Sequence, residues 1–145
     1  MIDIRRLETL PDTELGPLLA QSQAEGHGMV AKLRKHWISG AQRFDGDGEA
    51  LYGAYGDGNL VGVGGRAIDP YRNDRRVARV QRLYVLPAWR GQGVGRALMR
   101  RIVEEGAGRF ATVTVRAPSA DAGLFYEALG FAPVSRETET HVLML

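Results

Sequence analysis

Cysteine is absent from this chain of 145 residues, and so are several other features that would indicate a particular class of protein. Without cysteine the chain has no disulfide bond, no thiolate nucleophile and no cysteine-ligated metal. No run of about 18 apolar residues occurs, so we expect no membrane span. Residues 1–6 lack the apolar stretch of a signal peptide, which favours a cytoplasmic protein.

Lysine is also scarce, because only Lys32 and Lys35 occur among the 19 basic residues. The arginines are spread from Arg5 to Arg136 and are interleaved with 17 acidic residues, so the formal net charge is only +2. A nucleic-acid-binding protein usually concentrates basic and aromatic residues on one face. We therefore expect no nucleic-acid partner. The three histidines do not have the spacing of metal ligands, and we expect no metal.

The residues that are present suit an ordinary globular protein, with 44% hydrophobic and 25% charged residues. The length suits a single domain, residues 1–145, with one hydrophobic core. The apolar patterns predict strands at residues 2–7, 49–55, 59–68, 77–86, 110–116, 131–135 and 138–145. They predict helices from a cap at Thr9 to about Ala24, around 30–40, and at 94–105 and 119–129. This order of elements predicts a mixed α/β sheet with helices on its faces.

Residues 90–95, with the sequence Arg-Gly-Gln-Gly-Val-Gly, are the most informative stretch of the chain. They lie between a predicted strand and a predicted helix, whose first N–H groups lack partners within the helix. Glycine lets an anion approach the backbone closely, and the helix dipole favours negative charge there. Arg90 and Arg96 add positive charge. The stretch therefore predicts a binding site for a pyrophosphate group.

Other phosphate-binding motifs fit this stretch poorly. No Lys-Ser or Lys-Thr pair occurs anywhere in the chain, which excludes a P-loop. The glycine spacing differs from that of a dinucleotide fingerprint, and residues 111–115 carry no acid about 20 residues later, which disfavours a nucleotide-binding oxidoreductase. The remaining pattern, Arg-x-x-Gly-x-Gly, is carried by Arg90, Gly93 and Gly95. It resembles the acetyl-CoA-binding signature of the GNAT superfamily of N-acetyltransferases.

A second segment, residues 119–131, is similar to that family's Asn-x-x-Ala-x-x-Leu/Phe-Tyr-x-x-x-Gly-Phe motif. Ala122, Phe125 and Leu129 fall on one face of a helix that Gly130 ends. Together the two motifs extend the resemblance over about residues 49–135. It implies the GNAT fold, a mixed and mostly antiparallel sheet of six to seven strands with about four helices. In that fold a bulge splays the fourth strand from the fifth.

The resemblance also implies the roles of individual residues. Tyr126 matches the general acid that protonates the departing thiolate, a reaction that suits a phenol. The alternative role for Tyr126 is that of a packing aromatic residue. In the family, the glycine-rich turn binds pyrophosphate, and the strand before it pairs with the pantetheine arm and positions the thioester carbonyl. The residues expected to bind acetyl-CoA are Leu83, Val85, Arg90, Gly91, Gln92, Gly93, Val94, Gly95, Arg96, Ser119 and Tyr126.

The general base departs from the family pattern, because Gln81 stands where many members have a glutamate. Ser119 likewise replaces the usual asparagine. An alkyl ammonium must lose a proton before it attacks, so a water relay or another side chain is required. The side chains considered for this role are Glu25, Glu49, His27 and His141.

Two arginines in predicted strands, Arg66 and Arg79, are open to two interpretations. They can face a substrate carboxylate, or they can form ion pairs or a solvated face.

The resemblance predicts an enzyme that moves an acetyl group from acetyl-CoA to a primary amine. The alternative is a sensor that binds coenzyme A without turnover, which the missing glutamate allows. The resemblance does not decide which amine accepts the acetyl group: a small metabolite amine, an aminoglycoside-like compound, a peptide N-terminus or a lysine. The use of other acyl groups also stays open, and a homodimer is an expectation from the family alone.

Overall fold

The computed structural model describes residues 1–145 and contains one seven-stranded sheet with the strand order β1-β2-β3-β4-β5-β7-β6. The strands are β1 (Ile2–Arg6), β2 (Ala50–Gly56), β3 (Asn59–Ile68), β4 (Val77–Val85), β5 (Thr112–Val115), β6 (Ala132–Pro133) and β7 (His141–Met144). The helices are α1 (Asp12–Ala24), α2 (Met29–Ser39), α3 (Val94–Glu104) and α4 (Ala120–Ala128), with a short 3-10 turn η1 (Pro87–Trp89). All neighbouring strands are antiparallel except β4 and β5. The predicted mixed, mostly antiparallel sheet is confirmed.

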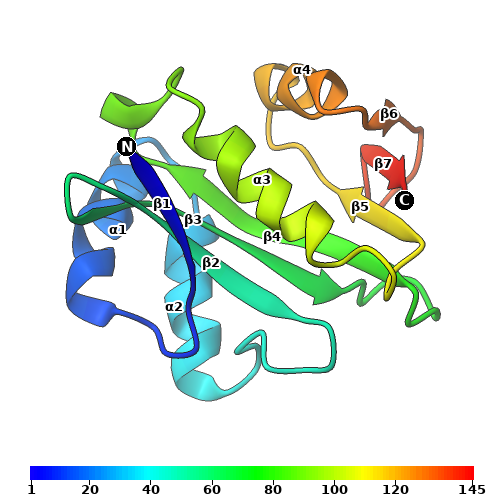
Figure 1. The fold of residues 1–145 in the computed structure, drawn as a ribbon, viewed down its shortest axis with the longest axis horizontal. Coiled ribbons are helices and arrows are strands. Elements are labelled where there is room, and N and C mark those ends of the chain that lie inside the picture. Colours follow the sequence, from blue (N-terminus) through cyan, green and yellow to red (C-terminus); the bar gives the residue numbers. More distant parts are fainter.

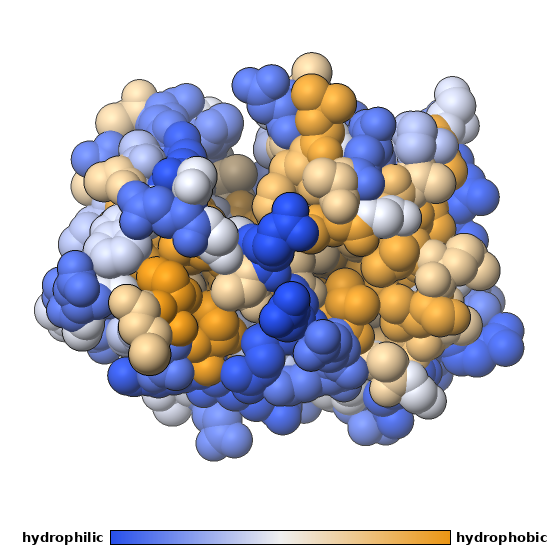
Figure 2. All heavy atoms as spheres, turned by 45° about the horizontal axis from the view of Figure 1, so that its top comes forward, coloured by the Kyte–Doolittle hydropathy of each residue, from blue (hydrophilic) through white to orange (hydrophobic).

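The helices cover both faces of the sheet, with α3 on one face and α1 and α2 on the other (Figure 1). Beneath α3, Val94, Leu98 and Ile102 are buried in one apolar cluster, as the spacing of four residues predicts. A second cluster holds the buried side chains of α1 and α2 on the opposite face. Figure 2 turns the top of Figure 1 forward and shows two groups of apolar side chains separated by polar ones.

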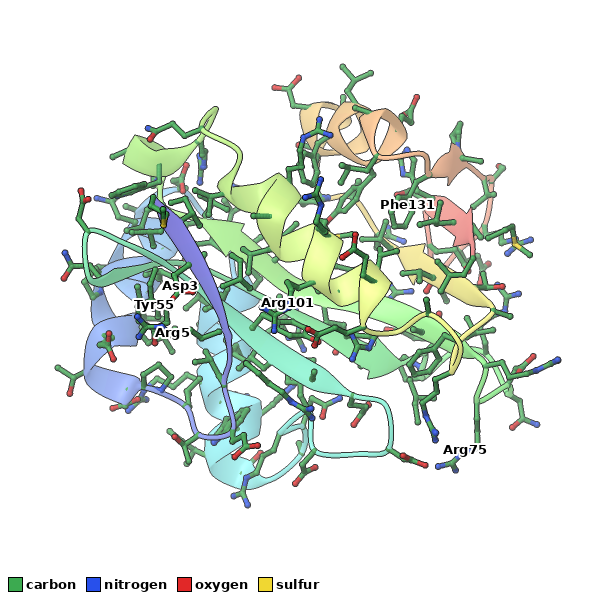
Figure 3. The ribbon with its side chains drawn as sticks, viewed as in Figure 1. Asp3, Arg5, Tyr55, Arg75, Arg101 and Phe131 are labelled. Atoms are coloured by element: carbon green, nitrogen blue, oxygen red, sulfur yellow. The ribbon has the colours of Figure 1, made fainter.

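The edge strand β1 is joined to its neighbours by arginine side chains. Arg5 lies over the ring of Tyr55 at 4.2 Å and bonds to Asp3 at 2.7 Å (Figure 3). Arg101 of α3 donates to the carbonyl oxygen of Ile4 at 2.9 Å. The Arg101 bond attaches α3 to the edge strand β1, and the contact of Arg5 with Tyr55 joins β1 to β2.

The fourth and fifth strands separate after a short paired stretch, as the resemblance implied. Only Val77, Ala78 and Arg79 of β4 pair with β5. Farther along β4, the register with β3 shifts and Arg82 has a φ of 60°, in the left-handed region. An extra residue in one strand bends it and increases its twist. The bulge therefore directs the end of β4 away from β5.

The structure corrects the predicted start of the first helix. Thr9 does not cap it, because α1 begins at Asp12 with Pro11 in the cap position and no side-chain capping bond. The ring of a proline disfavours helical geometry at the residue before it, so the helix cannot extend back past Leu10.

The two closing strands are also shorter than predicted, and β6 contains only Ala132 and Pro133. Proline has no N–H group to donate, which limits how far this edge strand can pair. None of the four helices combines the length and the apolar character that crossing a membrane requires.

Candidate active site

The turn before α3 leaves a row of backbone donors without partners. Gly91 and Gly93 have φ values of 74° and 85°, which a glycine adopts without strain from a side chain. Gly93 is the N-cap of α3, and no side chain caps this helix. None of the N–H groups of residues 91–96 donates a hydrogen bond within the protein. These donors and the positive end of the helix dipole make the turn suitable for an anion.

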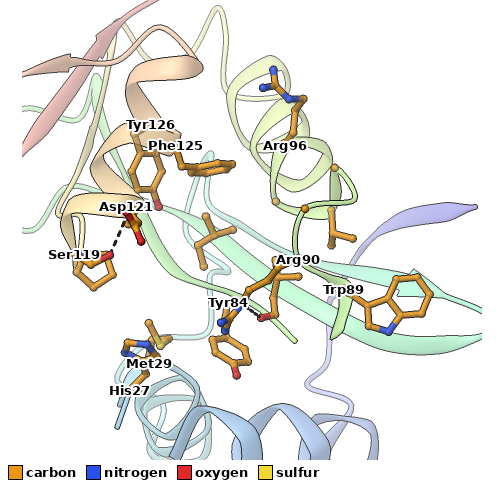
Figure 4. A pocket seen from close by; sticks show the side chains of 18 residues that line it. His27, Met29, Tyr84, Trp89, Arg90, Arg96, Ser119, Asp121, Phe125 and Tyr126 are labelled. Atoms are coloured by element: carbon orange, nitrogen blue, oxygen red, sulfur yellow. Dashed lines mark hydrogen bonds between the residues drawn. The ribbon is translucent and has the colours of Figure 1, made fainter. Parts of the chain in front are cut away.

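A cavity of about 580 Å³ adjoins this turn. Its walls come from the end of β4, the start of α3, the helix α4, and His27 and Met29 near the start of α2 (Figure 4). Ten of the eleven residues predicted to bind the cofactor line it. The exception is Gln92, whose side chain donates to the carbonyl oxygen of Ala88 at 3.0 Å. Gln92 therefore closes the turn with its side chain.

Gly95 allows α4 to approach the first turn of α3. A Cβ atom at this position would lie 3.2 Å from the ring of Phe125, closer than most side chains tolerate. Phe125 in turn contacts Tyr126 edge-on, with 5.2 Å between the ring centroids. The third glycine of the motif is thus explained by helix packing, which sets the width of the cavity.

Tyr126 is held rigidly on the buried face of α4. Its ring is 3% exposed, lies 5.5 Å from that of Phe131, and its hydroxyl group is directed toward the cavity (Figure 4). Burial raises the pKa of the phenol above its ordinary value. The hydroxyl therefore keeps its proton at neutral pH and is available as a proton donor toward the cavity.

Arg90 is neutralised by a residue that lies far away in the sequence. Its two Nη atoms each donate to the carboxylate of Glu25 at 2.7 Å, and the Tyr84 hydroxyl donates to the same carboxylate at 2.5 Å. The bonds from Arg90 and from Tyr84 lower the pKa of Glu25 to about 2. Arg90 therefore adds less positive charge to the turn than the sequence predicts, and Glu25 is a poor proton acceptor.

The end of β4 offers its backbone to the open side of the sheet. Leu86 donates its N–H to the carbonyl oxygen of Val61 in β3 at 2.9 Å. Backbone groups alternate between the two edges of a strand, so the N–H and carbonyl of Val85 face the gap left by β5. The Val85 carbonyl accepts a bond from Arg90 Nε at 3.0 Å. Arg90 therefore helps to fix the backbone of Val85, whose own N–H group borders the cavity.

The remaining side chains considered as bases differ in their position. Glu49 accepts hydrogen bonds from the N–H groups of Gly46 and Ile68 and lines neither of the cavities at the site. His141 is buried, with its ring nitrogens 2.8 Å from Thr140 Oγ1 and 3.0 Å from Glu127 Oε2. His27 alone among the four lines the cavity beside the turn.

A second cavity, of about 570 Å³, lies where β4 and β5 separate and is closed by α2. Gln81 lines it. The two cavities share four lining residues, Met29, Leu83, Pro118 and Tyr126. Tyr126 therefore lies at the junction between the cavity next to the glycine-rich turn and the second cavity. This arrangement can bring two substrates together at one phenol.

Two residues considered in the sequence, Ser119 at the site and Arg66 away from it, have structural roles. Ser119 Oγ accepts the N–H of Ala122 at 3.1 Å, so it serves as the N-cap of α4. Arg66 is buried and donates to the carbonyl oxygens of Gly48 and Ile102 at 2.8 Å, which is a structural role.

The residues that line the first cavity beyond those predicted fall into two groups. Asp121, Ala122 and Phe125 lie within the second motif, which was the available signal for them. Tyr84 lies between Leu83 and Val85, in the strand that the resemblance assigns to the pantetheine arm. Met29 had no signal in the sequence, because its position depends on how α2 packs.

Comparison with known proteins agrees with this geometry. Residues 47–133 match a family model described as an acetyltransferase (GNAT) domain. A structure from Exiguobacterium sp. 255-15, named as an acetyltransferase, is 31% identical with a TM-score of 0.89, covering 99% of this chain and 93% of the other. No curated protein sequence matches the chain significantly.

Two more distant structures share the fold alone. A ribosomal-protein-alanine N-acetyltransferase from Brucella melitensis is 20% identical with a TM-score of 0.71, over 99% of both chains. An acetyltransferase from Streptococcus agalactiae is 17% identical with a TM-score of 0.75, over 99% of this chain and 98% of the other. The family match and the Exiguobacterium structure add similarity of sequence to similarity of fold. The chain therefore belongs to the GNAT family of N-acetyltransferases.

Proposed function

We propose that this enzyme transfers an acetyl group from acetyl-CoA to a primary amine by direct attack, with residues 1–145 acting as one domain. The observation that carries the proposal is the row of unpaired N–H groups at residues 91–96, beside a cavity that ends at Tyr126. A pyrophosphate group suits those donors. The pantetheine arm would extend along Leu83 and Val85 toward Tyr126. When bound, acetyl-CoA supplies an activated acyl group and a thiolate leaving group.

The side chains and backbone of the chain then act on the reacting atoms. The Val85 N–H stabilises negative charge that develops on the carbonyl oxygen as the amine nitrogen bonds to the carbonyl carbon. Tyr126 gives its proton to sulfur as the carbon–sulfur bond breaks. The amine loses one proton to water, and solvent returns a proton to Tyr126. The products are an amide and coenzyme A.

We propose a water relay as the route by which the amine loses its proton. Glu25 is held by Arg90, Glu49 is held by backbone N–H groups, and His141 lies outside both cavities. Of the four side chains considered as the base, only His27 remains as an alternative to the water relay. If His27→Ala removes the dependence of kcat on pH near neutrality while Glu49→Gln does not, His27 is the base.

A thiol-release assay with a panel of primary amines separates the enzyme from the coenzyme A sensor. Turnover on any amine that falls sharply in Tyr126→Phe supports the proposal. Tight binding of coenzyme A, measured by calorimetry, together with no turnover on any amine favours the sensor, which Gln81 at the position of the family's glutamate would permit.

The test of the anion-binding turn is separate. Absence of heat when coenzyme A is titrated into the protein contradicts the assignment of residues 91–96. The cytoplasmic location and the homodimer remain predictions, and sedimentation equilibrium tests the second.

A further inference from the structure

The lining of the second cavity carries positive charge and no negative charge. Lys32 comes from α2, Arg79 and Arg82 come from β4, and Arg116 follows β5. None of the 14 residues that line this cavity is an aspartate or a glutamate. The first cavity differs, since Asp121 lines it and Glu25 neutralises its Arg90.

Three of these four cations have no carboxylate partner within the protein. Arg116 Nη1 donates to the backbone carbonyl of Glu137 at 2.6 Å, and Arg82 Nη2 donates to Nδ1 of His36 at 3.3 Å. Neither of these arginines forms an ion pair, and Lys32 forms none either. No carboxylate of the protein therefore compensates the charge of these three side chains, of which Lys32 and Arg116 are exposed and Arg82 is half-buried.

Arg79 is only partly compensated. Its nearest carboxylate oxygen, Oδ2 of Asp69, lies 3.9 Å away and accepts instead from the Thr114 hydroxyl at 2.5 Å. The side chain of Arg79 is 8% exposed, and its Nη1 atom is buried with no hydrogen-bond partner. Its Nη2 atom donates to the carbonyl oxygen of Thr138 at 2.6 Å, and its guanidinium lies 4.8 Å from the centre of the Tyr71 ring. No carboxylate lies closer than that of Asp69, so a further negative charge near the buried Nη1 atom would stabilise the group.

Arg82 is placed by the bulge of β4 in a conformation that few side chains adopt. Its φ of 60° is uncommon for a residue other than glycine, and such conformations concentrate at functional sites. The side chain is half-buried, and desolvation together with the neighbouring Arg79 lowers the pKa of its guanidinium. Both effects are relieved when an anion binds beside it.

We propose that the acceptor is an amine that also carries a carboxylate or a phosphate group, and that Arg82 and Arg116 bind this anionic group. The inference rests on the proposed function, because it assigns the second cavity to the acceptor. The anionic group would lie toward the arginines, which leaves the amine near Tyr126 at the junction of the cavities. Repulsion within this cavity disfavours polycations, including aminoglycoside-like compounds and lysine-rich peptides.

The same charge offers a physical role in catalysis. Nearby cations lower the pKa of an ammonium group, which increases the fraction of neutral amine. Only the neutral amine can attack the thioester carbonyl. Cations of the cavity that the anionic group leaves unpaired, such as Lys32 and Arg79, therefore compensate in part for Gln81, which stands where a glutamate would otherwise take the proton.

Matched pairs of amines test the inference. O-phosphoethanolamine is compared with ethanolamine, and β-alanine with its amide, while spermidine serves as a polycation. We expect kcat/KM for the anionic member of at least one pair to exceed that of its neutral partner by about tenfold or more. The two pairs distinguish phosphate from carboxylate. A neutral amine or spermidine used as well as the anionic members overturns the inference.

Variants of the cavity arginines provide a second test. Arg82→Gln and Arg116→Gln should each raise the KM for the preferred anionic amine about tenfold, with the KM for acetyl-CoA unchanged. The matched control is Arg75→Gln, since Arg75 is exposed, lines neither cavity and projects away from α4 (Figure 3). An equal effect of the control, or no effect of either cavity variant, contradicts the inference.

Calorimetry separates this inference from the proposed function. Coenzyme A is titrated into the protein first. O-phosphoethanolamine and β-alanine are then titrated separately into the same protein, and this second step is carried out whatever the result of the first. Absence of heat with coenzyme A contradicts the proposed function alone. Heat with an anionic amine that weakens in Arg82→Gln supports the inference, and absence of heat with both anionic amines overturns it.

Discussion

At the scale of single residues, Tyr126 shows how a motif and a fold can agree. The second motif singles it out, and the structure places it at the junction of two cavities with its ring packed between aromatic neighbours. Tyr126→Phe keeps that packing and removes only the hydroxyl. We expect kcat to fall by about 100-fold or more, the size of a general-acid contribution. Steady-state kinetics measure this change. The KM for acetyl-CoA should change little, because the packing of the ring is kept.

Tyr55→Phe is the matched control for that experiment. Tyr55 is also buried, and burial likewise raises the pKa of its phenol, but it lines neither cavity. Equal losses of kcat in both variants would show that the effect comes from a weakened core.

The ion pair between Glu25 and Arg90 predicts how stability depends on pH. The pKa of Glu25 falls from 4.5 to about 2 on folding, so its contribution is present above pH 4.5 and is lost as the pH falls toward 2. Burial and the bond to Glu25 raise the pKa of Tyr84 from 10.0 to about 12, so its contribution is lost as the pH rises through that range. Glu25→Gln should flatten the acid arm of a plot of the urea midpoint against pH.

Glu8→Gln, at an exposed acid that makes no ion pair, should leave that acid arm unchanged. The idea fails if both variants flatten it equally. No local pattern could have predicted this pair, because 65 residues separate its members.

At the scale of elements, the start of α3 depends on two glycines for different reasons. Gly93 needs its φ of 85°, and a Cβ there would meet nothing within 4 Å, whereas Gly95 is limited by the ring of Phe125. We expect Gly93→Ala to lower the free energy of unfolding by about 1–2 kcal/mol, the cost of a left-handed conformation. It should also weaken the binding of coenzyme A. Denaturant unfolding and calorimetry measure the two effects.

The control for this prediction is Gly16→Ala in α1. Gly16 lies inside a helix with a helical φ, and a Cβ there would contact nothing within 4 Å. The gain of about 0.5–1 kcal/mol from replacing a helical glycine is offset by Pro17, whose ring disfavours helical geometry at a preceding residue that carries a Cβ. The free energy of unfolding and the binding of coenzyme A should therefore both change little. If Gly93→Ala is as stable as the wild type, the left-handed turn is not required.

The elements themselves follow largely from local patterns. The stripe of Val94, Leu98 and Ile102 predicts α3, and the Asp57-Gly58 pair predicts the hairpin between β2 and β3. The start of α1 was predicted wrongly, because the restriction that Pro11 imposes on the residue before it outweighs the capping tendency of Thr9.

At the scale of the whole molecule, charge is distributed unevenly although the net charge is only +2. Three of the four cations of the second cavity lack a carboxylate partner, whereas most of the cations elsewhere form an ion pair. We expect the KM for an anionic amine to rise several-fold between about 0.05 and 0.5 M salt, because ions screen these charges. The KM for a neutral amine should change little. Kinetics at a series of salt concentrations would show the difference, and equal salt effects on both amines would contradict it.

The sequence by itself determined the glycine-rich turn with its unpaired N–H groups, the helix behind it and the family to which the chain is similar. These features depend on the conformations of adjacent residues, which short stretches of sequence specify. Only the tertiary structure decided that Glu25 neutralises Arg90 and that Lys32, Arg82 and Arg116 share one cavity. These side chains come from separate helices and strands, and the order of the sheet with the bulge in β4 brings them together.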